Sequence, residues 1–275
     1  MSTPLPQDLA GVRKQPSPLI ALIAFIGYLA VLIVTYILVA GDIDFGDLAA
    51  TPGNTRDVVV IPVLVATVYL TVVTTLLGWW KPALRDSSAV RKAPKWMWAL
   101  PAFAVLMCAI NLTQSEHRGD FTTIHWTWII VGFLLVGFSE ELMTRGLLVV
   151  GFRSKFGEKQ VIVLTSLLFA VMHGTNILFG QSASSTIAQV AFNIPMGVLF
   201  YTLRRTSGSL ILPMLVHALW DISLVVFGGT AGSLNELDPD GPQPATVIPV
   251  VAFCVIALLV HRKRLLHGDA QTAGG

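Results

Sequence analysis

Residues 124–150 read IHWTWIIVGFLLVGFSEELMTRGLLVV and combine the length of a membrane span with three charged side chains. A helix of roughly 20 apolar residues crosses a hydrocarbon core about 30 Å thick. Glu140, Glu141 and Arg145 lie inside this stretch. A charged group at the bilayer centre costs at least about 2.5 to 3.5 kcal/mol on insertion scales, so such groups are functional candidates by default. The segment therefore predicts a membrane helix that carries a polar site.

The composition of the whole chain also indicates a membrane protein. Of the 275 residues, 54% are hydrophobic and 12% are charged, and the mean hydropathy is +0.71. A soluble domain carries about 25% charged residues. Candidate spans run approximately over residues 19–40, 58–80, 96–112, 124–150, 160–179, 184–203, 210–227 and 247–260. We therefore predict an all-α integral membrane protein, a polytopic bundle of about eight transmembrane helices.

The basic residues are distributed unequally between the two sides of this predicted bundle. With eight spans, both termini lie on one side, and 15 of the 18 Lys and Arg residues fall there. The opposite side has only Arg56 and Arg118, and its loops are otherwise acidic. The positive-inside rule then places both termini in the cytoplasm. The formal net charge of +2 is too small to suggest a nucleic-acid partner.

Polar side chains recur at a similar depth in four of the predicted spans. Counted at about 1.5 Å per helical residue from the terminal side, Glu140 lies about 15 Å deep, His173 about 20 Å and His217 about 11 to 15 Å. Asp221 follows one turn deeper than His217, and Asn193 lies at about 15 Å on the same count. We expect these groups to converge on one polar cavity that opens to the cytoplasm.

The spacing within each span places chemically useful groups on common helix faces. Pairs four residues apart share a face, and the pairs here are Glu141 with Arg145, Phe169 with His173, and His217 with Asp221. Glu140 and Glu141 point about 100° apart, so one can pair with Arg145 while the other faces the cavity. A carboxylate in such a cavity can act as a general base toward water, and nearby imidazoles can position the water or donate to an oxyanion.

Three motifs in this order resemble those of a known family. Residues 140–145 fit the pattern EExxxR, residues 169–173 fit FxxxH, and residues 217–221 fit HxxxN/D. The set is similar to the CAAX protease and bacteriocin-processing family of intramembrane endopeptidases, which includes the type 2 CAAX prenyl endopeptidases. The resemblance covers roughly residues 124–227, and the predicted span number is also similar to that family's plan.

The resemblance implies that a water activated by a glutamate hydrolyses, within the membrane, a peptide bond of a membrane-associated or prenylated-like peptide or protein. By motif position, Glu140 is the general base, His173 helps to hold the water, and His217 with residue 221 stabilises the oxyanion. Supporting roles are expected for Glu141, Arg145, Phe169 and Asn193. Many relatives have Asn where this chain has Asp221, so we expect Asp221 either to be protonated or to orient and charge His217.

Other interpretations stay open at this point. No cofactor is predicted, but zinc held by His173, His217 and Glu140 is an alternative mechanism. Buried Glu, His and Asp also occur in proton-coupled transporters, although the sequence has no inverted repeat. A non-catalytic membrane scaffold or bacteriocin-immunity protein is the third possibility.

The expected organisation is one integral domain with three regions. Residues 1–123 form a three-span region, 124–227 the catalytic core, and 228–275 an outer loop, the last span and a cytoplasmic tail. The expected partners are the lipid bilayer and a peptide or protein substrate cleaved close to the membrane, and the expected location is the cell membrane. Cys108 and Cys254 lie in apolar stretches and predict neither a disulfide framework nor a thiolate zinc motif.

Overall fold

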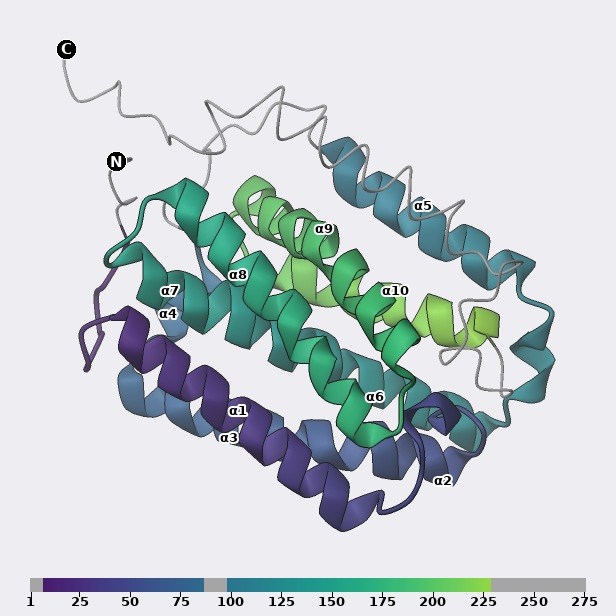
Figure 1. The fold of residues 1–275 in the computed structure, drawn as a ribbon. Coiled ribbons are helices and arrows are strands. Elements are labelled where there is room, and N and C mark those ends of the chain that lie inside the picture. The colour runs from purple at the N-terminus through teal and green to yellow at the C-terminus, as the bar shows by residue number, and fades with distance from the viewer. Residues whose placement is uncertain (1–6, 87–97, 229–275) are drawn as a thin grey trace.

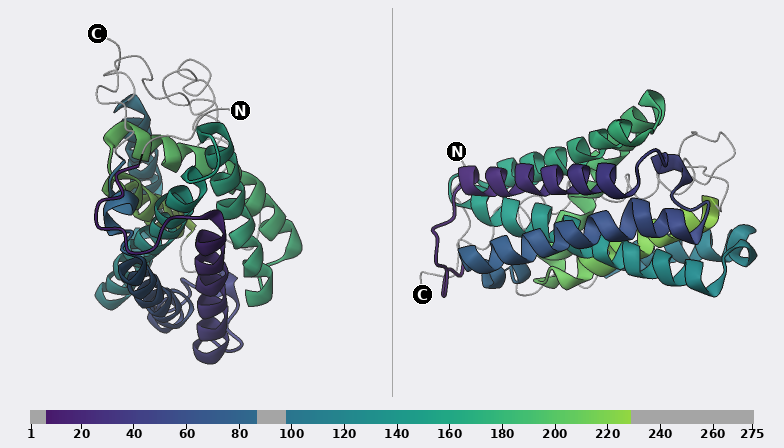
Figure 2. Two further views of the ribbon diagram at one scale, coloured as in Figure 1. Left: turned by 90° about the vertical axis from the view of Figure 1, so that its left-hand side faces the viewer. Right: turned by 90° about the horizontal axis from the view of Figure 1, so that it is seen from below.

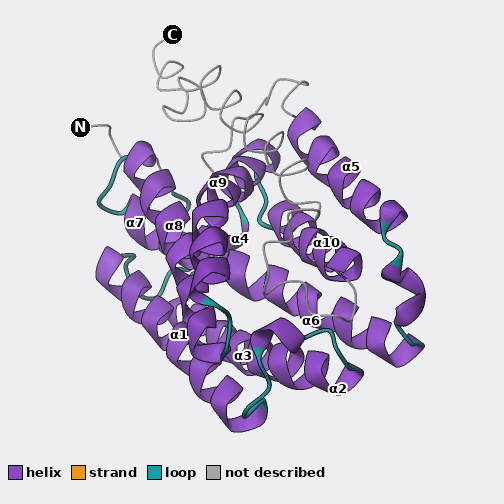
Figure 3. Ribbon diagram, turned by 45° about the vertical axis from the view of Figure 1, so that its right-hand side comes forward, coloured by secondary structure: helices purple, strands orange, loops and turns teal. Residues whose placement is uncertain are grey.

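The computed structural model describes residues 7–86 and 98–228, and these residues form helices joined by short links (Figure 1). Figure 3 shows no strand in the described ranges, where Arg85 and Ser209 form an isolated bridge. The α-helices are α1 (Pro18–Val39), α2 (Pro52–Asn54), α3 (Ile61–Leu77), α4 (Trp80–Leu84), α5 (Ala99–Gln114), α6 (Thr123–Glu141), α7 (Val149–Arg153), α8 (Glu158–Met172), α9 (Ala183–Ser207) and α10 (Ile211–Gly228). The predicted all-α fold is confirmed for these residues.

Shorter helical segments of different winding interrupt or extend these helices. The 3₁₀ segments are η1 (Phe45–Asp47), η4 (His117–Asp120) and η6 (His173–Phe179). The π-helical segments, which have a wider turn, are η2 (Thr55–Val60) and η5 (Leu142–Leu148). Segments of this kind inside longer helices occur frequently at functional sites.

Six helical stretches in the described ranges are long and apolar enough to cross a membrane. They are Pro18–Val39, Pro52–Leu77, Thr123–Arg153, Glu158–Phe179, Ala183–Ser207 and Ile211–Gly228. These match six of the predicted spans. The predicted span 96–112 corresponds to a shorter apolar helix, α5, and the predicted span 247–260 lies outside the described residues. The total of eight and the cytoplasmic placement of both termini therefore stay predictions.

The outer surface of the bundle is apolar, as contact with lipid tails requires. On α1, Leu38 is 78% exposed and Leu19 is 67% exposed, and on α3 Leu76 is 65% exposed. Such a surface would be unfavourable in water. The polar residues of the spans are instead turned toward the interior of the bundle, as described below.

The helix ends follow from local sequence. Ser17 precedes α1, and its hydroxyl oxygen accepts a hydrogen bond from the Ile20 amide at 3.2 Å, which satisfies a free N–H of the first turn. Pro18 fits this first turn because its position needs no N–H donor. Gly78 and Gly208 follow α3 and α9 with φ angles of 71° and 70°, a left-handed conformation that favours glycine and stops the helix.

A continuous helix made of α6, η5 and α7 lies at the centre of the bundle (Figures 1 and 2). It packs against α10, α3 and α1, while α8 and α9 pack against each other. Gly137 brings α6 close to α10, because a Cβ atom at this position would collide with the Met214 carbonyl oxygen. The contact lies one turn before Glu140 and beside the turn that carries His217. It therefore sets the distance between these two side chains.

A buried group of charged residues joins the helices at one end of the bundle. Arg153 donates to both carboxylate oxygens of Asp86, at 3.1 Å each, and also to Glu158 and to the Tyr201 hydroxyl. Arg205 lies 3.3 Å from Asp86. Burial opposes the charge on Asp86, but the surrounding arginines hold the pKa of this carboxyl well below its usual range. The network links the segment after α4 to α7, α8 and α9.

Candidate active site

Four side chains from three helical segments meet inside the bundle. Glu140 comes from the end of α6, His173 from the junction of α8 and η6, and His217 and Asp221 from α10. The Nε2 atoms of His173 and His217 each lie 3.9 Å from the same atom, Glu140 Oε2. His217 Nε2 is also 3.4 Å from Asp221 Oδ2. The structure thus brings together the four residues expected from the sequence to carry the chemistry.

Glu141 and Arg145 form the support beneath this cluster. Glu141 Oε1 accepts hydrogen bonds from Arg145 Nη1 at 2.9 Å and from His217 Nδ1 at 3.0 Å. Both Glu141 and Arg145 have no exposed side-chain surface. The two neighbouring glutamates therefore have different surroundings, as their angular separation predicts. Glu141 is paired internally, and Glu140 faces the cavity.

The structure places a second carboxylate, Glu141, beside His217. The sequence suggests that Asp221 is either protonated or orients and charges His217 from one turn away. In the structure Glu141 holds Nδ1, whereas Asp221 approaches Nε2, the nitrogen that also faces Glu140. A sequence pattern within one helix cannot reveal this contact, because it joins α6 to α10.

His173 is oriented by the backbone of its own helix. Its Nδ1 donates to the Phe169 carbonyl oxygen at 2.8 Å. A carbonyl oxygen only accepts, so Nδ1 carries the hydrogen and the neutral ring has its lone pair on Nε2. This lone pair is on the nitrogen closest to Glu140. His173 can therefore accept a hydrogen bond from a water bound at Glu140.

Phe169 contacts residues of all three motifs. The Arg145 guanidinium carbon lies 4.0 Å from the Phe169 ring centroid, a cation–π contact. The imidazoles of His173 and His217 pack edge-on against the same ring, with centroids 5.0 and 5.6 Å away. Phe200, which the sequence did not single out, stacks on His217 at 4.5 Å. These aromatic contacts fix the planes of both imidazoles.

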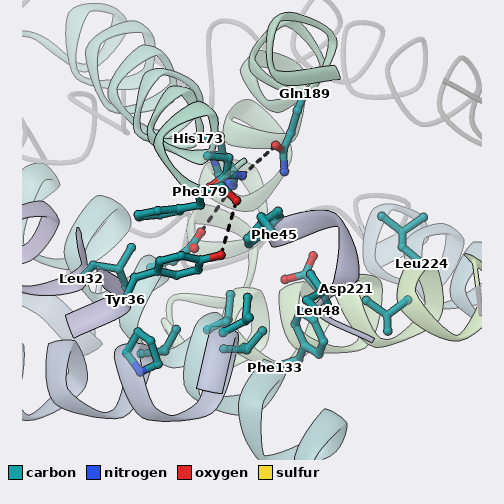
Figure 4. Close-up of a pocket in the computed structure, with 18 residues that line it drawn as sticks. Leu32, Tyr36, Phe45, Leu48, Phe133, His173, Phe179, Gln189, Asp221 and Leu224 are labelled. Atoms are coloured by element: carbon teal, nitrogen blue, oxygen red, sulfur yellow. Dashed lines mark hydrogen bonds and ion pairs between the residues drawn. The ribbon is translucent and has the colours of Figure 1, made fainter. Parts of the chain in front are cut away.

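A cavity of about 160 Å³ adjoins the cluster (Figure 4). Glu140, His173 and Asp221 line it, and their side chains are 17%, 14% and 22% exposed, whereas His217 is 5% exposed. The rest of the lining is mostly apolar and includes Leu32, Tyr36, Val59, Phe133, Phe179 and Leu224. Three of the four clustered side chains thus line the cavity, and His217 is the most buried of the four.

Two amides complete the polar part of the lining, and neither was expected from the sequence. Asn176 donates to Gln189 Oε1 at 2.9 Å, which joins η6 to α9 beside His173. The expected supporting residue Asn193 is buried one turn further along α9 and does not line the cavity. The signal for Gln189 is its spacing, because it lies four residues before Asn193 on the same helix face.

The cavity lining includes residues near the ends of several helices. Its lining residues come from the ends of helices next to residues 40–51 and 180–182, such as Tyr36, Phe179 and Gln189. On the other side of Glu140, the side chains from Leu142 to Val150 are completely buried. The lining therefore extends from the cluster toward residues 40–51 and 180–182, and the expectation that the cavity opens to the cytoplasm stays a prediction.

The distances between the possible ligand atoms can be compared with those of a zinc site. Zinc ligands lie about 2.0 to 2.2 Å from the ion in a tetrahedron, so two ligand atoms are roughly 3.3 Å apart. The two histidine nitrogens are each 3.9 Å from the Glu140 oxygen. Within the described ranges, no group of three or more His, Cys, Asp or Glu side chains is arranged to hold a metal ion.

The comparison with protein families identifies the segment that contains this cluster. A family model described as Type II CAAX prenyl endopeptidase Rce1-like matches residues 122–223. The match begins at the residue that caps α6 and ends two residues after Asp221, so it includes all three motifs. Among curated proteins, none matches the chain. The family is one of membrane proteases, and this multi-pass membrane protein contains its Rce1-like segment, as the three motifs indicate.

Proposed function

We propose that the chain is an intramembrane endopeptidase in which Glu140 activates a water to hydrolyse a peptide bond. The observation that carries the proposal is the position of Glu140 Oε2. This oxygen makes no hydrogen bond to the protein, although the Nε2 atoms of two histidines lie 3.9 Å from it. This oxygen is buried, and a water that enters beside it from the cavity can donate to the carboxylate and to a histidine, which is the arrangement that general-base catalysis needs.

The proposed reaction proceeds through a tetrahedral intermediate. Glu140 removes a proton from the water while the water oxygen bonds to the carbonyl carbon, and the electron pair of the C=O bond moves onto its oxygen. When the intermediate collapses, the C=O bond forms again and the C–N bond breaks. Glu140 then transfers its proton to the leaving nitrogen. The products are a carboxylic acid and an amine, and Glu140 is regenerated.

The two histidines have different roles in this scheme. His173 accepts from the water through Nε2, because its Nδ1 hydrogen is held by the Phe169 carbonyl. His217 donates its Nδ1 hydrogen to Glu141, so it can donate to the oxyanion from Nε2 only as an imidazolium. The neighbouring carboxylates of Glu141 and Asp221 provide the compensating negative charge. Preorganised donors of this kind stabilise the transition state.

The cavity also suggests a class of substrate. Its lining is polar near Glu140 and apolar elsewhere, so it suits a peptide segment with apolar side chains beside the cleaved bond. We propose that the substrate is a membrane-associated peptide or protein. A substrate anchored in the bilayer would reach the cluster without crossing water.

The test compares membrane proteomes of cells that express the wild-type chain, Glu140→Gln or His173→Ala. The proposal expects at least one uncleaved precursor to accumulate with both variants, and peptides from that precursor then serve as substrates for the purified protein. Loss of a general base should lower kcat/KM by about 10²-fold or more. The matched control is Glu116→Gln, an exposed glutamate on a loop, which should process the precursor normally. Normal processing by Glu140→Gln would overturn the proposal.

A further inference from the structure

Asn176 and Gln189 form a pair of amide side chains in the wall of the cavity that Glu140 lines, and we call them the amide pair. Asn176 Nδ2 donates to Gln189 Oε1 at 2.9 Å. A primary amide has two N–H groups and one carbonyl oxygen, so this bond leaves both hydrogens of Gln189 Nε2 available. Within the described residues, Nε2 donates to no other group. Figure 4 shows the Gln189 side chain extending from its helix toward the cavity, beside His173.

The other polar side chains of the described lining offer no hydrogen to a carbonyl oxygen in the cavity. The carboxylates of Glu140 and Asp221 only accept hydrogen bonds. His173 binds a backbone carbonyl oxygen with its Nδ1 hydrogen and presents the lone pair of Nε2. The Tyr36 hydroxyl also donates to a backbone carbonyl oxygen, at 2.6 Å. The side-chain donors that the described lining leaves available are therefore those of the amide pair.

A peptide bound beside Glu140 needs such donors. Its carbonyl oxygens lose their bound water in a cavity whose lining is otherwise mostly apolar. A typical hydrogen bond that is lost in this way lowers affinity by roughly 10-fold. A donor at the cavity wall prevents this loss.

The amide pair also lies at a suitable distance from the bond that would be cleaved. η6 is a 3₁₀ segment, in which each residue rises about 2.0 Å and side chains three residues apart lie above one another. Asn176 follows His173 by three residues, so it lies on the same face about 6 Å further along. An extended peptide advances about 3.3 Å per residue. A peptide attacked beside Glu140 can therefore bring a carbonyl oxygen within two residues of the cleaved bond to the amide pair.

Backbone and side-chain contacts hold the amide pair in place without a substrate. The Asn176 carbonyl oxygen accepts from the Gly180 amide and, at 3.1 Å, from the Gln181 amide. Gln181 Oε1 in turn accepts from the Thr186 hydroxyl of α9 at 3.1 Å. Asn176 itself is only 8% exposed. Because η6 and α9 are joined in this way, little conformational freedom remains to be lost when a peptide binds.

We propose that the amide pair binds the main chain of the substrate. Gln189 Nε2 donates to a carbonyl oxygen within two residues of the cleaved bond, and Asn176 is a positioning residue that orients Gln189. The proposal rests on the proposed hydrolysis, because only that activity requires a peptide in the cavity. In an α-helix each carbonyl oxygen is already bonded to an N–H four residues on. The contact therefore selects a substrate that is extended at the cleaved bond, whatever its side chains are.

The test uses the purified protein and a fluorogenic peptide that spans the cleavage site of a precursor that accumulates with Glu140→Gln. Gln189→Met keeps the length of the side chain but removes its N–H groups. It should raise KM about 10-fold with little change in kcat, because binding of the ground state is lost. Asn176→Ala keeps the N–H groups without their orientation and should raise KM by a smaller factor. The matched control is Gln114→Met, an exposed glutamine at the end of α5, which should have wild-type kinetics.

Substrate analogues distinguish donation to a carbonyl oxygen from a packing role. In each analogue, one peptide group within two residues of the cleaved bond is replaced by a trans-alkene, which keeps the shape but has no carbonyl oxygen. For one of these analogues the wild type should lose about 10-fold in kcat/KM, and Gln189→Met should lose nothing further. The wild type and the variant should thus cleave that analogue equally well.

Two results would overturn the role of the amide pair and leave the hydrolysis standing. One is a wild-type KM in Gln189→Met. The other is a loss in Gln189→Met by the same factor for the peptide and for every analogue, because packing alone explains such a loss. If Gln189→Met does not fold, Asn176→Ala is judged by the same two criteria. Cleavage of the peptide by Glu140→Gln at the wild-type rate would instead overturn the hydrolysis, and the role of the amide pair with it.

Discussion

Glu141 on α6 and His217 on α10 are joined by a hydrogen bond of 3.0 Å between Glu141 Oε1 and His217 Nδ1, although 76 residues separate them in the sequence. The same carboxylate oxygen binds Arg145. Glu141 therefore has two separable tasks, because it balances a buried guanidinium and it holds the imidazole. Each task has its own measurable consequence.

The first prediction separates these tasks with Glu141→Gln. Removing one partner of a buried charge pair costs about 3–5 kcal/mol, so the melting temperature of the detergent-solubilised protein should fall. The double variant Glu141→Gln/Arg145→Met should recover most of this loss, because no unpaired charge is left. The peptidase kcat of the double variant should remain about 10²-fold or more below that of the wild type, because His217 still lacks the Glu141 carboxylate. Recovery of both stability and kcat in the double variant would show that Glu141 serves Arg145 alone.

The second prediction concerns Asp221, which lies 3.4 Å from His217 Nε2. Asp221→Asn should keep or increase kcat, because the amide can donate to an oxyanion and His217 keeps its bond to Glu141. Asp221→Ala removes the carboxylate without supplying a donor in its place and should lower kcat by about 10-fold or more. Equal inactivity of the two variants would mean that the negative charge of Asp221 is required.

The third prediction distinguishes a glutamate mechanism from a zinc mechanism. We expect the purified enzyme to keep its peptidase activity after dialysis against a strong chelator and to contain less than one zinc per chain. The reason is that Arg145, whose charge lies against the Phe169 ring beside both histidines, would repel a bound dication. Elemental analysis and activity are measured on the same sample. Activity that disappears with the chelator and returns with zinc would replace Glu140 by a metal as the activating group.

The fourth prediction uses the lowered pKa of Asp86, which lies in the buried charged network after α4. A carboxyl whose pKa is lower in the folded than in the unfolded protein stabilises the fold above its unfolded pKa, about 3.9, and loses this contribution as the pH falls below that value. Asp86→Asn should therefore lower the melting temperature strongly at pH 7, in line with a loss of about 3–5 kcal/mol. The difference from wild type should shrink at pH 3.

Asp47→Asn is the matched control for this measurement. Asp47 is an exposed aspartate on the link after α1, so its variant should melt like wild type at both pH values. A difference between Asp86→Asn and wild type that stays constant from pH 7 to pH 3 would contradict the role of the Asp86 charge.

The amino-acid pattern predicted most of the helices because apolar length is a local property. The six long spans differ from their predicted bounds by a few residues, and the largest extension is at the start of Pro52–Leu77, which includes the π segment η2. The sequence also placed Glu140, His173, His217 and Asp221 at a common depth. These residues do meet, because helices of similar length and opposite direction bring equal depths together.

Contacts between helices could not be predicted in the same way. The bond from Glu141 to His217 and the stacking of Phe200 on His217 depend on how the helices rotate about their axes. Gln189 lines the cavity and the expected Asn193 does not, and the rotation of α9 is again the cause. The complete burial of η5 likewise depends on the helices packed around it, which no single motif describes.

The buried network of Asp86, Arg153, Glu158 and Arg205 also constrains how the chain is assembled. Asp86 is synthesised before Arg153 and Arg205, which lie 67 and 119 residues further along the chain. Its carboxylate cannot pair with these arginines until α7 and α9 have been inserted. The contacts of Asp86, two residues after α4, therefore form late, when α7 and α9 pack against this earlier part of the chain. The ion pairs of Asp86 can therefore form only after the helices that carry Glu140, His173 and these arginines are in position.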